Sequence, residues 1–139
     1  YAVKTGGASN HRLGLHDMAM IKDNHIEVAG GITAAVKAVR SSVDHGIKIE
    51  VETTTLAQVQ EAIDAKADII MLDELSLDDM RAAVSLSAGR ARLEASGGIN
   101  RQTLRAIAET AAGLRGISLA ALSVQTEINV AQLLAFQTA

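Results

Sequence analysis

Five short apolar runs divide the chain, and each is followed by a polar loop and then by a segment with apolar residues at helical spacing. Short apolar runs are typical of buried strands, and an apolar residue every three to four positions is typical of an amphipathic helix. The pattern therefore predicts alternating strands and helices. The predicted strands are residues 19–22, 47–52, 68–73, 91–96 and 116–120.

Helices are predicted after each strand. The first carries Ile32, Val36, Val39 and Val43 at helical spacing, and the last covers residues 126–136. The three helices between them carry Leu56, Val59 and Ile63; Leu77, Met80 and Val84; and Leu104, Ile107 and Ala108. Residues that commonly cap helix ends flank these three, namely Thr54 or Thr55, Ser76 with Asp79, Asn100, and Gly113.

Strands that alternate with helices imply βαβ units and a parallel sheet. Five such units fit in 139 residues, whereas a complete eight-stranded barrel takes about 200–250 residues. The sheet is therefore either open and doubly wound or part of a barrel. Since no linker or low-complexity segment divides the chain, we expect one domain over residues 1–139.

Charged residues along one face of the predicted strands favour the barrel. Apolar and charged residues alternate in the second strand (Ile47 to Glu52) and in the fourth (Arg92 to Ser96), so one face is apolar and the other is charged. A doubly wound sheet is apolar on both faces, whereas the interior of a barrel can hold a polar site. We predict an α/β fold, an incomplete (β/α) barrel of about five βα units with a parallel sheet. Simple charge pairing across strands, such as Lys48 with Glu50 or Glu94, stays open as an alternative.

Composition and charge exclude several classes of protein and of site. The chain has no cysteine, which excludes disulfides and thiolate metal sites. Its net charge of −3, from 13 basic and 16 acidic residues, gives no reason to expect nucleic acid or an anionic membrane as a partner. No apolar run approaches the ~18 residues of a membrane span, and the N-terminus does not resemble a signal peptide, so we expect a cytoplasmic protein.

Polar residues stand at the C-terminal ends of the first four predicted strands. They are Lys22 with Asp23, Glu52, Asp73, and Glu94 with Ser96. Barrels and other α/β folds build their active sites at this end of parallel strands. Carboxylates there suit a hard cation, which takes oxygen ligands. Lys22 and the upstream pair His11 and Arg12 suit an anionic substrate.

A glycine pair, Gly97 and Gly98, follows Ser96 and precedes a predicted helix. Glycines in such a loop let backbone N–H groups approach a phosphate near the helix start, although a plain turn is the alternative interpretation. His16 and His45 are expected at the surface. No two histidines have the spacing of a zinc site.

Five segments carry a family resemblance: NHRLGL at residues 10–15, IKDNHI at 21–26, EVE at 50–52, ADIIMLD at 67–73 and LEASGGI at 93–99. In order and spacing they resemble quinolinate phosphoribosyltransferase, also called nicotinate-nucleotide pyrophosphorylase (carboxylating). The resemblance covers nearly the whole chain and weakens after about Ser118. A related molybdenum-transport-associated family shares the architecture, but the KDNH run favours the quinolinate enzymes.

The resemblance implies transfer of a phosphoribosyl group from phosphoribosyl pyrophosphate to quinolinate, with loss of carbon dioxide and pyrophosphate. The product would be nicotinate mononucleotide, which feeds NAD synthesis. The resemblance also implies that His11, Arg12 and Lys22 bind the quinolinate carboxylates. Lys22, Glu52 and Asp73 would be the catalytic residues.

Magnesium would accompany the pyrophosphate donor, with Glu52 and Asp73 as its ligands at the ribose. Their negative charge could also stabilise a cationic ribosyl transition state. Glu94 would support the same site as a substrate-binding residue. The resemblance implies that Ser96, Gly97 and Gly98 hold phosphate.

The chain departs from the family's pattern in several places. It begins after the family's N-terminal domain and after a first barrel strand with a Thr-Arg-Lys-Thr motif. Glu74 stands where the family has Asn. Ala120 and Val124 replace a Gly and a His, and residues 125–139 no longer resemble the family.

Three functions are therefore open: an enzyme, a folded barrel fragment without turnover, and a remnant that binds a phosphate or a dicarboxylate. The chain lacks proline and tryptophan and begins with Tyr1 instead of Met, which suggests a fragment or an engineered chain. An open sheet edge invites pairing with another chain, so we also expect a homo-oligomer.

Overall fold

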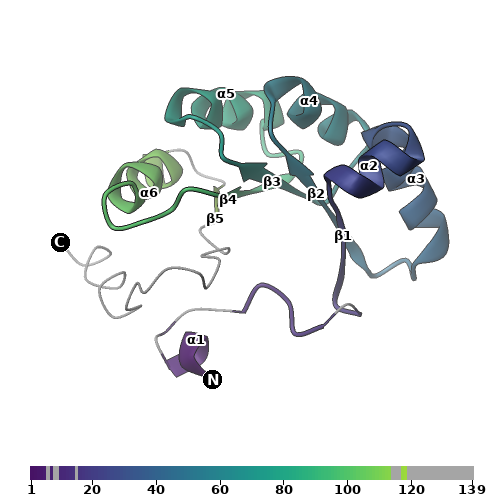
Figure 1. The fold of residues 1–139 in the computed structure, drawn as a ribbon, viewed down its shortest axis with the longest axis horizontal. Helices are drawn as coiled ribbons and strands as arrows, with labels where there is room; N and C mark the ends of the chain where they lie inside the picture. Colours follow the sequence, from purple (N-terminus) through teal and green to yellow (C-terminus); the bar gives the residue numbers. More distant parts are fainter. Residues whose placement is uncertain (6, 8–9, 15, 114–116, 119–139) are drawn as a thin grey trace.

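In the part of the chain that the structure describes, five parallel strands form one sheet, in the order in which they occur along the chain (Figure 1). They are β1 (Met18–Ile21), β2 (Lys48–Thr53), β3 (Ile69–Asp73), β4 (Arg92–Ser96) and β5 (Ile117–Ser118). The computed structural model describes residues 1–5, 7, 10–14, 16–113 and 117–118. The strand bounds lie within one or two residues of those predicted from the apolar runs.

The helices are α1 (Ala2–Thr5), α2 (Asp23–Ala29), α3 (Ile32–Ser42), α4 (Leu56–Asp64), α5 (Leu77–Ser87) and α6 (Leu104–Gly113). Four of them, α3 to α6, confirm helices predicted from apolar spacing. At the start of α4, Thr55 Oγ1 accepts a hydrogen bond from Gln58 N at 3.2 Å. At the start of α5, Ser76 Oγ accepts one from Asp79 N at 3.1 Å. The helix predicted over residues 126–136 lies outside the described residues.

The sequence pattern does not predict α1 and α2. Asp23, Asn24 and His25 have low helix propensity, and α2 buries none of its residues, so no apolar stripe marks it. Local contacts define its ends instead. His25 Nδ1 accepts a hydrogen bond from Lys22 N at 3.0 Å, and Gly30 ends the helix in the left-handed region with φ 82°.

The apolar core lies between the sheet and the helices that follow its strands. Ile49 and Val51 of β2 are fully buried and belong to one cluster with Val59 of α4 and Ala83 of α5. Figure 1 shows α2, α3, α4 and α5 together on one side of the sheet. The alternation predicted for β2 and β4 is confirmed, because their apolar residues face these helices and their charged residues face away.

Strand order and helix placement are those of a barrel wall. Each strand lies beside the next one in sequence, and helices α2 to α5 cover the same face. A doubly wound sheet instead reverses its strand order at a switch point and carries helices on both faces. Within the described residues, β1 and β5 form the two edges of an open arc. The predicted incomplete (β/α) barrel is confirmed.

The N-terminal segment lies on the sheet face opposite the helices and leads into β1 (Figure 1). Arg12 Nη1 donates a hydrogen bond to Met18 O at 3.2 Å, and Leu13 N donates one to Asp17 Oδ2 at 2.6 Å. These bonds fold the segment back against the start of β1. In the described part of the chain, no helix has the length and apolar character needed to cross a membrane.

Candidate active site

Three glutamates share the sheet face opposite the helices. In the parallel register Glu50 lies beside Ile69, and Glu52 and Glu94 lie on either side of Met71. Strand residues two positions apart point to the same face, and aligned residues of neighbouring strands do too. Glu50, Glu52 and Glu94 therefore share one face of the sheet, with Ile69 and Met71 of β3 between β2 and β4, as the charge alternation predicted.

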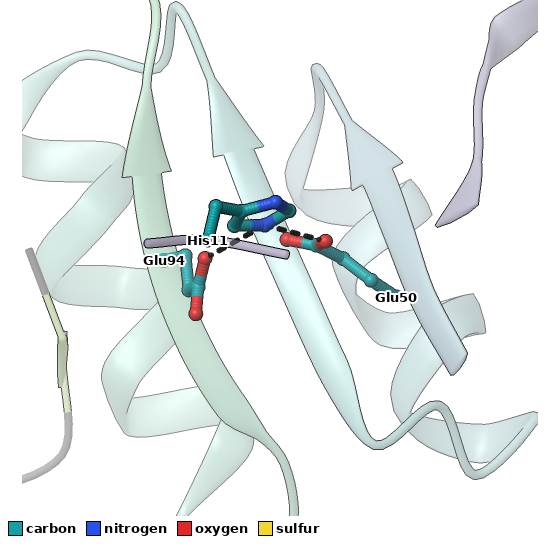
Figure 2. Close-up of side chains that lie close together, drawn as sticks. All are labelled: His11, Glu50 and Glu94. Carbon is teal, nitrogen blue, oxygen red and sulfur yellow. Dashed lines mark ion pairs between the residues drawn. The ribbon is translucent and has the colours of Figure 1, made fainter. Parts of the chain in front are cut away.

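His11 stands between two of these carboxylates (Figure 2). Its Nε2 is 2.9 Å from Glu50 Oε2 and 3.4 Å from Glu94 Oε2. Glu50 is fully buried, the side chain of Glu94 is 2% exposed, and that of His11 is 23% exposed. Glu50 comes from β2 and Glu94 from β4, so the imidazole bridges two strands that are separated by β3.

Burial raises the pKa of Glu50 above its ordinary value of 4.5, and loss of hydration is the largest cause. The nearby Glu94 carboxylate raises this pKa further, whereas His11 and Arg12 lower it. The net upward direction means that the charged form is disfavoured by its surroundings. Carboxyl groups whose pKa is shifted by burial and by neighbouring charges are concentrated at functional sites.

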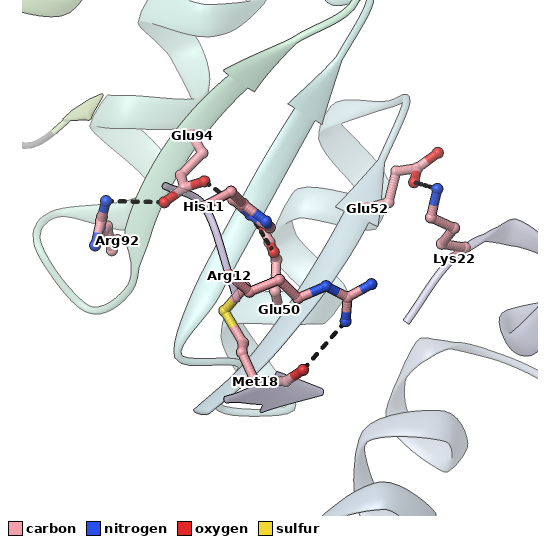
Figure 3. A network of polar contacts seen from close by, with 8 residues as sticks. All are labelled: His11, Arg12, Met18, Lys22, Glu50, Glu52, Arg92 and Glu94. Carbon is pink, nitrogen blue, oxygen red and sulfur yellow. Dashed lines mark hydrogen bonds and ion pairs between the residues drawn. The ribbon is translucent and has the colours of Figure 1, made fainter. Parts of the chain in front are cut away.

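Two arginines border the same cluster (Figure 3). Arg92 Nη2 is 2.9 Å from Glu94 Oε1, on the side of that carboxylate away from His11. The guanidinium of Arg12 binds Met18 O, and its positive charge acts on Glu50. Glu94 is thus held between Arg92 and His11, and the cluster contains two acidic and three basic side chains.

Lys22 follows directly after β1 and reaches the end of β2. Its Nζ lies 3.6 Å from Glu52 Oε2 (Figure 3). The Lys22 side chain is 50% exposed and that of Glu52 is 20% exposed, so both are accessible to a ligand. The backbone of Lys22 is fixed at the start of α2 by its hydrogen bond to His25.

Asp73 ends β3 beside Ser96, which ends β4. The next residue, Glu74, has a left-handed backbone with φ 54°, and its N–H donates to Ser96 O at 3.0 Å. Gly97 packs against this turn with φ 74°. A Cβ on Gly97 would lie 2.8 Å from Glu74 N and 2.9 Å from Asp73 Oδ1, so only glycine fits without displacement.

The carbonyl of Gly98 ties the glycine loop to the turn before α6. Gly98 O accepts hydrogen bonds from Thr103 Oγ1 at 2.9 Å and from Asn100 Nδ2 at 3.3 Å. Asn100 Oδ1 in turn accepts from Gln102 N and Thr103 N, so Asn100 caps this turn and not α6 itself. A Cβ on Gly98 would meet no atom within 4 Å, so that side of the loop is open.

Two groups of donors on this face are relevant to a cation. The ligand atoms of His11, Glu50 and Glu94 all lie within 4.8 Å of one another. Glu50 Oε1 and Oε2, Glu94 Oε2 and His11 Nε2 are buried and make no hydrogen bond of normal geometry. The expected magnesium ligands, Glu52 and Asp73, are partly exposed carboxylates at the ends of the neighbouring strands β2 and β3.

The structure brings most of the predicted site residues together. His11 meets Glu94, Lys22 meets Glu52, and Asp73 lies against the loop of Ser96, Gly97 and Gly98. Arg12 is an exception, because its guanidinium binds a backbone carbonyl of β1. His16 and His45 are exposed, as predicted.

Glu50 is the site residue that sequence reasoning missed. The prediction concentrated on strand ends, and Glu50 lies three residues before the end of β2. The signal that pointed to it was the alternation that put a carboxylate on the polar face beside apolar Ile69. In the described part of the chain Glu50 and Glu94 pair with His11, not with Lys48 as the alternative of cross-strand pairing proposed.

A hollow lies at the opposite end of the sheet. It is lined by loop and strand residues that include Lys66, Asp68, Arg90 and Arg92. In this hollow Asp68 Oδ2 accepts hydrogen bonds from Arg40 Nη2 at 2.7 Å and from Ile49 N at 2.8 Å. These contacts join β2, α3 and the start of β3, so we infer that this end of the sheet stabilises the fold and does not bind substrate.

Comparison with known proteins identifies the same family as the sequence motifs. A family model described as quinolinate phosphoribosyl transferase, C-terminal domain, matches residues 1–129. A probable nicotinate-nucleotide pyrophosphorylase (carboxylating) of Synechocystis is 50% identical over 113 residues, which cover 79% of this chain and 38% of that protein. The corresponding protein of Bacillus subtilis is 46% identical over 123 residues, which cover 88% of this chain and 42% of that protein.

The structural comparison agrees. The nicotinate-nucleotide pyrophosphorylase from Francisella tularensis superposes with a TM-score of 0.77 at 48% identity, covering 85% of this chain and 41% of that one. The family match extends to residue 129, so the expectation that all of residues 125–139 lie outside the resemblance is wrong for the first five. The chain spans about two fifths of the length of the curated relatives just named. It belongs to the quinolinate phosphoribosyltransferase family, and residues 1–129 match the C-terminal domain of that family.

Proposed function

We propose that this chain carries the reaction surface of a quinolinate phosphoribosyltransferase. The enzyme would transfer the phosphoribosyl group of phosphoribosyl pyrophosphate to the ring nitrogen of quinolinate. Pyrophosphate and carbon dioxide would leave, and nicotinate mononucleotide would form for NAD synthesis. The observation that carries the proposal is the single polar sheet face on which the paired cations and carboxylates of the family's motifs lie together.

The substrate quinolinate is a dianion, and we assign its carboxylates to His11, Arg12 and Lys22. All three basic side chains lie at or beside the polar face of the sheet and are at least partly exposed. Among the described residues Lys22 pairs with one carboxylate, Glu52, at 3.6 Å, which is long for a direct salt bridge and leaves its donors available. Charge-assisted contacts of this kind contribute about 1.5–3 kcal/mol each.

Glu52 and Asp73 are proposed to act at the ribose. Positive charge develops on the sugar as pyrophosphate departs, and a nearby carboxylate stabilises that charge. Their oxygen donors also fit Mg²⁺, which would neutralise the pyrophosphate leaving group when bound. Asp73 is fixed for this task, because its carboxylate lies against Gly97 and the next residue is hydrogen-bonded to Ser96.

The loop of Ser96, Gly97 and Gly98 is proposed to hold the 5′-phosphate. Support comes from its position between the end of β4 and the turn that precedes α6, and from the open space beside Gly98. Backbone N–H groups in such a loop, near a helix start, favour a phosphate. Glu94 would contribute indirectly, since it contacts His11 and not the open surface.

The experiment is a product assay combined with titration. Wild-type chain is mixed with quinolinate, phosphoribosyl pyrophosphate and Mg²⁺, and nicotinate mononucleotide is measured by chromatography. Asp73→Asn should weaken Mg²⁺-dependent binding of phosphoribosyl pyrophosphate at least tenfold, measured by calorimetry. Asp44→Asn is the matched control, because Asp44 is exposed and precedes the start of β2, whereas the proposed site lies where the strands end. Equal affinities of the two variants would contradict the assignment of Asp73.

We also propose that the chain forms a homo-oligomer. The support is the open arc, in which β1 and β5 present unpaired edges within the described residues. Unpaired strand edges favour association with a second chain. Light scattering at several concentrations should give a mass of at least two chains, and the mass of a single chain throughout would contradict this proposal.

A further inference from the structure

We propose that Glu50 is a positioning residue that acts with Glu94 to fix the His11 imidazole, with a proton on Nε2 facing both carboxylates and Nδ1 left free for a ligand. This inference rests on the proposed function, in which His11 binds a carboxylate of quinolinate. It assigns a role to a buried carboxylate that lies outside the predicted catalytic set. The role is indirect, because Glu50 has no exposed surface with which to touch substrate.

The burial of Glu50 is the first step toward this role. Both of its carboxylate oxygens are buried and neither makes a hydrogen bond of normal geometry. A buried polar group without hydrogen bonds is costly, and a buried carboxylate more so. Among the described ion pairs, the partner of Glu50 is His11 Nε2 at 2.9 Å. The interaction with His11 is therefore the one that compensates the burial of the Glu50 carboxylate.

The geometry of the three groups fixes the ring. Glu50 and Glu94 approach the same nitrogen from two strands that the sheet holds rigidly apart. Figure 2 shows the imidazole lying across β3 between them, with its other nitrogen farther from both carboxylates. In the described part of the chain no hydrogen bond uses that second nitrogen. The sheet thus holds one nitrogen and leaves the other for a ligand.

Charge balance favours a proton over a metal ion on Nε2. Glu50 and Glu94 supply two negative charges, Arg92 supplies one positive charge at 2.9 Å from Glu94, and an imidazole protonated at both nitrogens supplies the second. With Arg12, which also acts on Glu50, the five side chains then carry one excess positive charge. A divalent cation beside a neutral imidazole would raise that excess to two. An imidazole protonated at both nitrogens donates at Nδ1, as a carboxylate ligand requires.

The same contacts dock the N-terminal segment. His11 and Arg12 are neighbours in sequence, and Arg12 is bound to Met18 O. When Glu50 and Glu94 hold His11, the segment crosses the polar face and brings Arg12 with it. Partners that orient a ligating histidine typically contribute 10–100-fold to affinity in metal sites, and we expect a loss in that range here.

The test is a nuclear magnetic resonance measurement on the full chain labelled with ¹⁵N histidine. The four histidines are few enough to resolve, and His11→Gln assigns the signals of His11. We expect the wild-type His11 to carry a slowly exchanging proton on Nε2. Glu50→Gln and Glu94→Gln should shift the His11 signals toward those of the exposed His45. Glu27→Gln is the matched control, because Glu27 is exposed on α2 and should leave them unchanged.

Three results would overturn the proposal. The first is a wild-type His11 with its proton on Nδ1 alone, a result that needs no variant to fold. The second is a folded Glu50→Gln variant whose His11 signals are unchanged. The third is a shift of the His11 signals on addition of a chelator, which would indicate a bound metal ion instead.

A quinolinate titration of the same samples separates this inference from the proposed function. We expect quinolinate to shift the His11 signals of the wild type, and Glu50→Gln to weaken that binding at least tenfold. If His11 is oriented as described but no signal responds to quinolinate, the orientation by Glu50 and Glu94 is supported and the proposed function fails. If quinolinate binds equally to the wild type and to Glu50→Gln, the positioning role is wrong.

Discussion

The carboxylate of Glu50 combines complete burial with a pKa above its ordinary value. A group whose pKa is higher in the folded chain than in the unfolded chain stabilises the fold at low pH, and this contribution is lost as pH rises through the folded value. At neutral pH the charge of Glu50 therefore lowers the free energy of unfolding. This cost in stability has a functional explanation if the Glu50 carboxylate is needed to hold His11.

Glu50→Gln should accordingly raise the free energy of unfolding at pH 7.5, because the amide has the same shape and no charge to bury. The gain should shrink as pH falls toward 4.5, because the raised pKa of Glu50 means that the folded wild type takes up this proton at a higher pH than an ordinary glutamate does. Urea unfolding at several pH values measures both effects. A variant that is less stable than the wild type at pH 7.5, with Glu27→Gln unchanged, would contradict this account of Glu50.

Gly97 and Gly98 provide a second contrast between single residues. Both have positive φ, but only Gly97 has neighbours in the space that a Cβ would occupy. Gly98→Ala should cost about 1–2 kcal/mol for the left-handed backbone alone. Gly97→Ala should cost more, because Asp73 and Glu74 must also move. Denaturation midpoints of the two variants measure the difference, and equal losses would show that the packing against Asp73 is unimportant.

Helices and strands were predictable where an apolar face marks them. The spacing of Val59 and Ile63 in α4, and the alternation in β2 and β4, reflect burial against one another and were readable from the sequence. α2 was missed because it buries no residue, and its start depends on a His25 contact that has no general sequence signature. Elements that bury an apolar face were therefore predictable from the sequence, and α2, which buries none of its residues, was not.

The same distinction holds in the site. Residues at strand ends, such as Glu52 and Asp73, were found because parallel strands bring their C-terminal ends together. The pairing of His11 with Glu50 was not predictable, because it depends on how a segment without regular structure crosses the sheet. Family resemblance supplied a role for His11 but not its partner.

The end of α5 offers a prediction at the scale of an element. Ala88 follows this helix in the left-handed conformation with φ 47°, a position that favours glycine. Ala88→Gly should raise the free energy of unfolding by about 0.5–1 kcal/mol, since glycine adopts this conformation without a Cβ penalty. Ala38→Gly, at an exposed site in the middle of α3, should lower it by about 1 kcal/mol. Thermal or urea unfolding compares them, and a loss in both variants would contradict the argument.

At the scale of the whole molecule, the two faces of the sheet have different roles: one packs the apolar core and the other carries the candidate site. One face packs apolar strand residues against α3, α4 and α5, and the other carries the charged residues of the family's motifs. The arc of five strands holds the carboxylates of β2, β3 and β4 together without a closed barrel in the described residues. The cytoplasmic location expected from the sequence stays a prediction.

The central claim is that anionic substrate binds where the strands end, and two lysines on the same side of the sheet test it. Lys22 lies beside the end of β2 and contacts Glu52, whereas Lys48 begins β2 and is exposed. Calorimetric titration of quinolinate into Lys22→Ala should show an affinity about 10- to 100-fold below the wild type, as expected for loss of a charge-assisted contact. Lys48→Ala, which removes the same charge from the other end of the strand, should retain the wild-type affinity. Equal affinities in both variants, or an equal loss in both, would contradict the placement of the site.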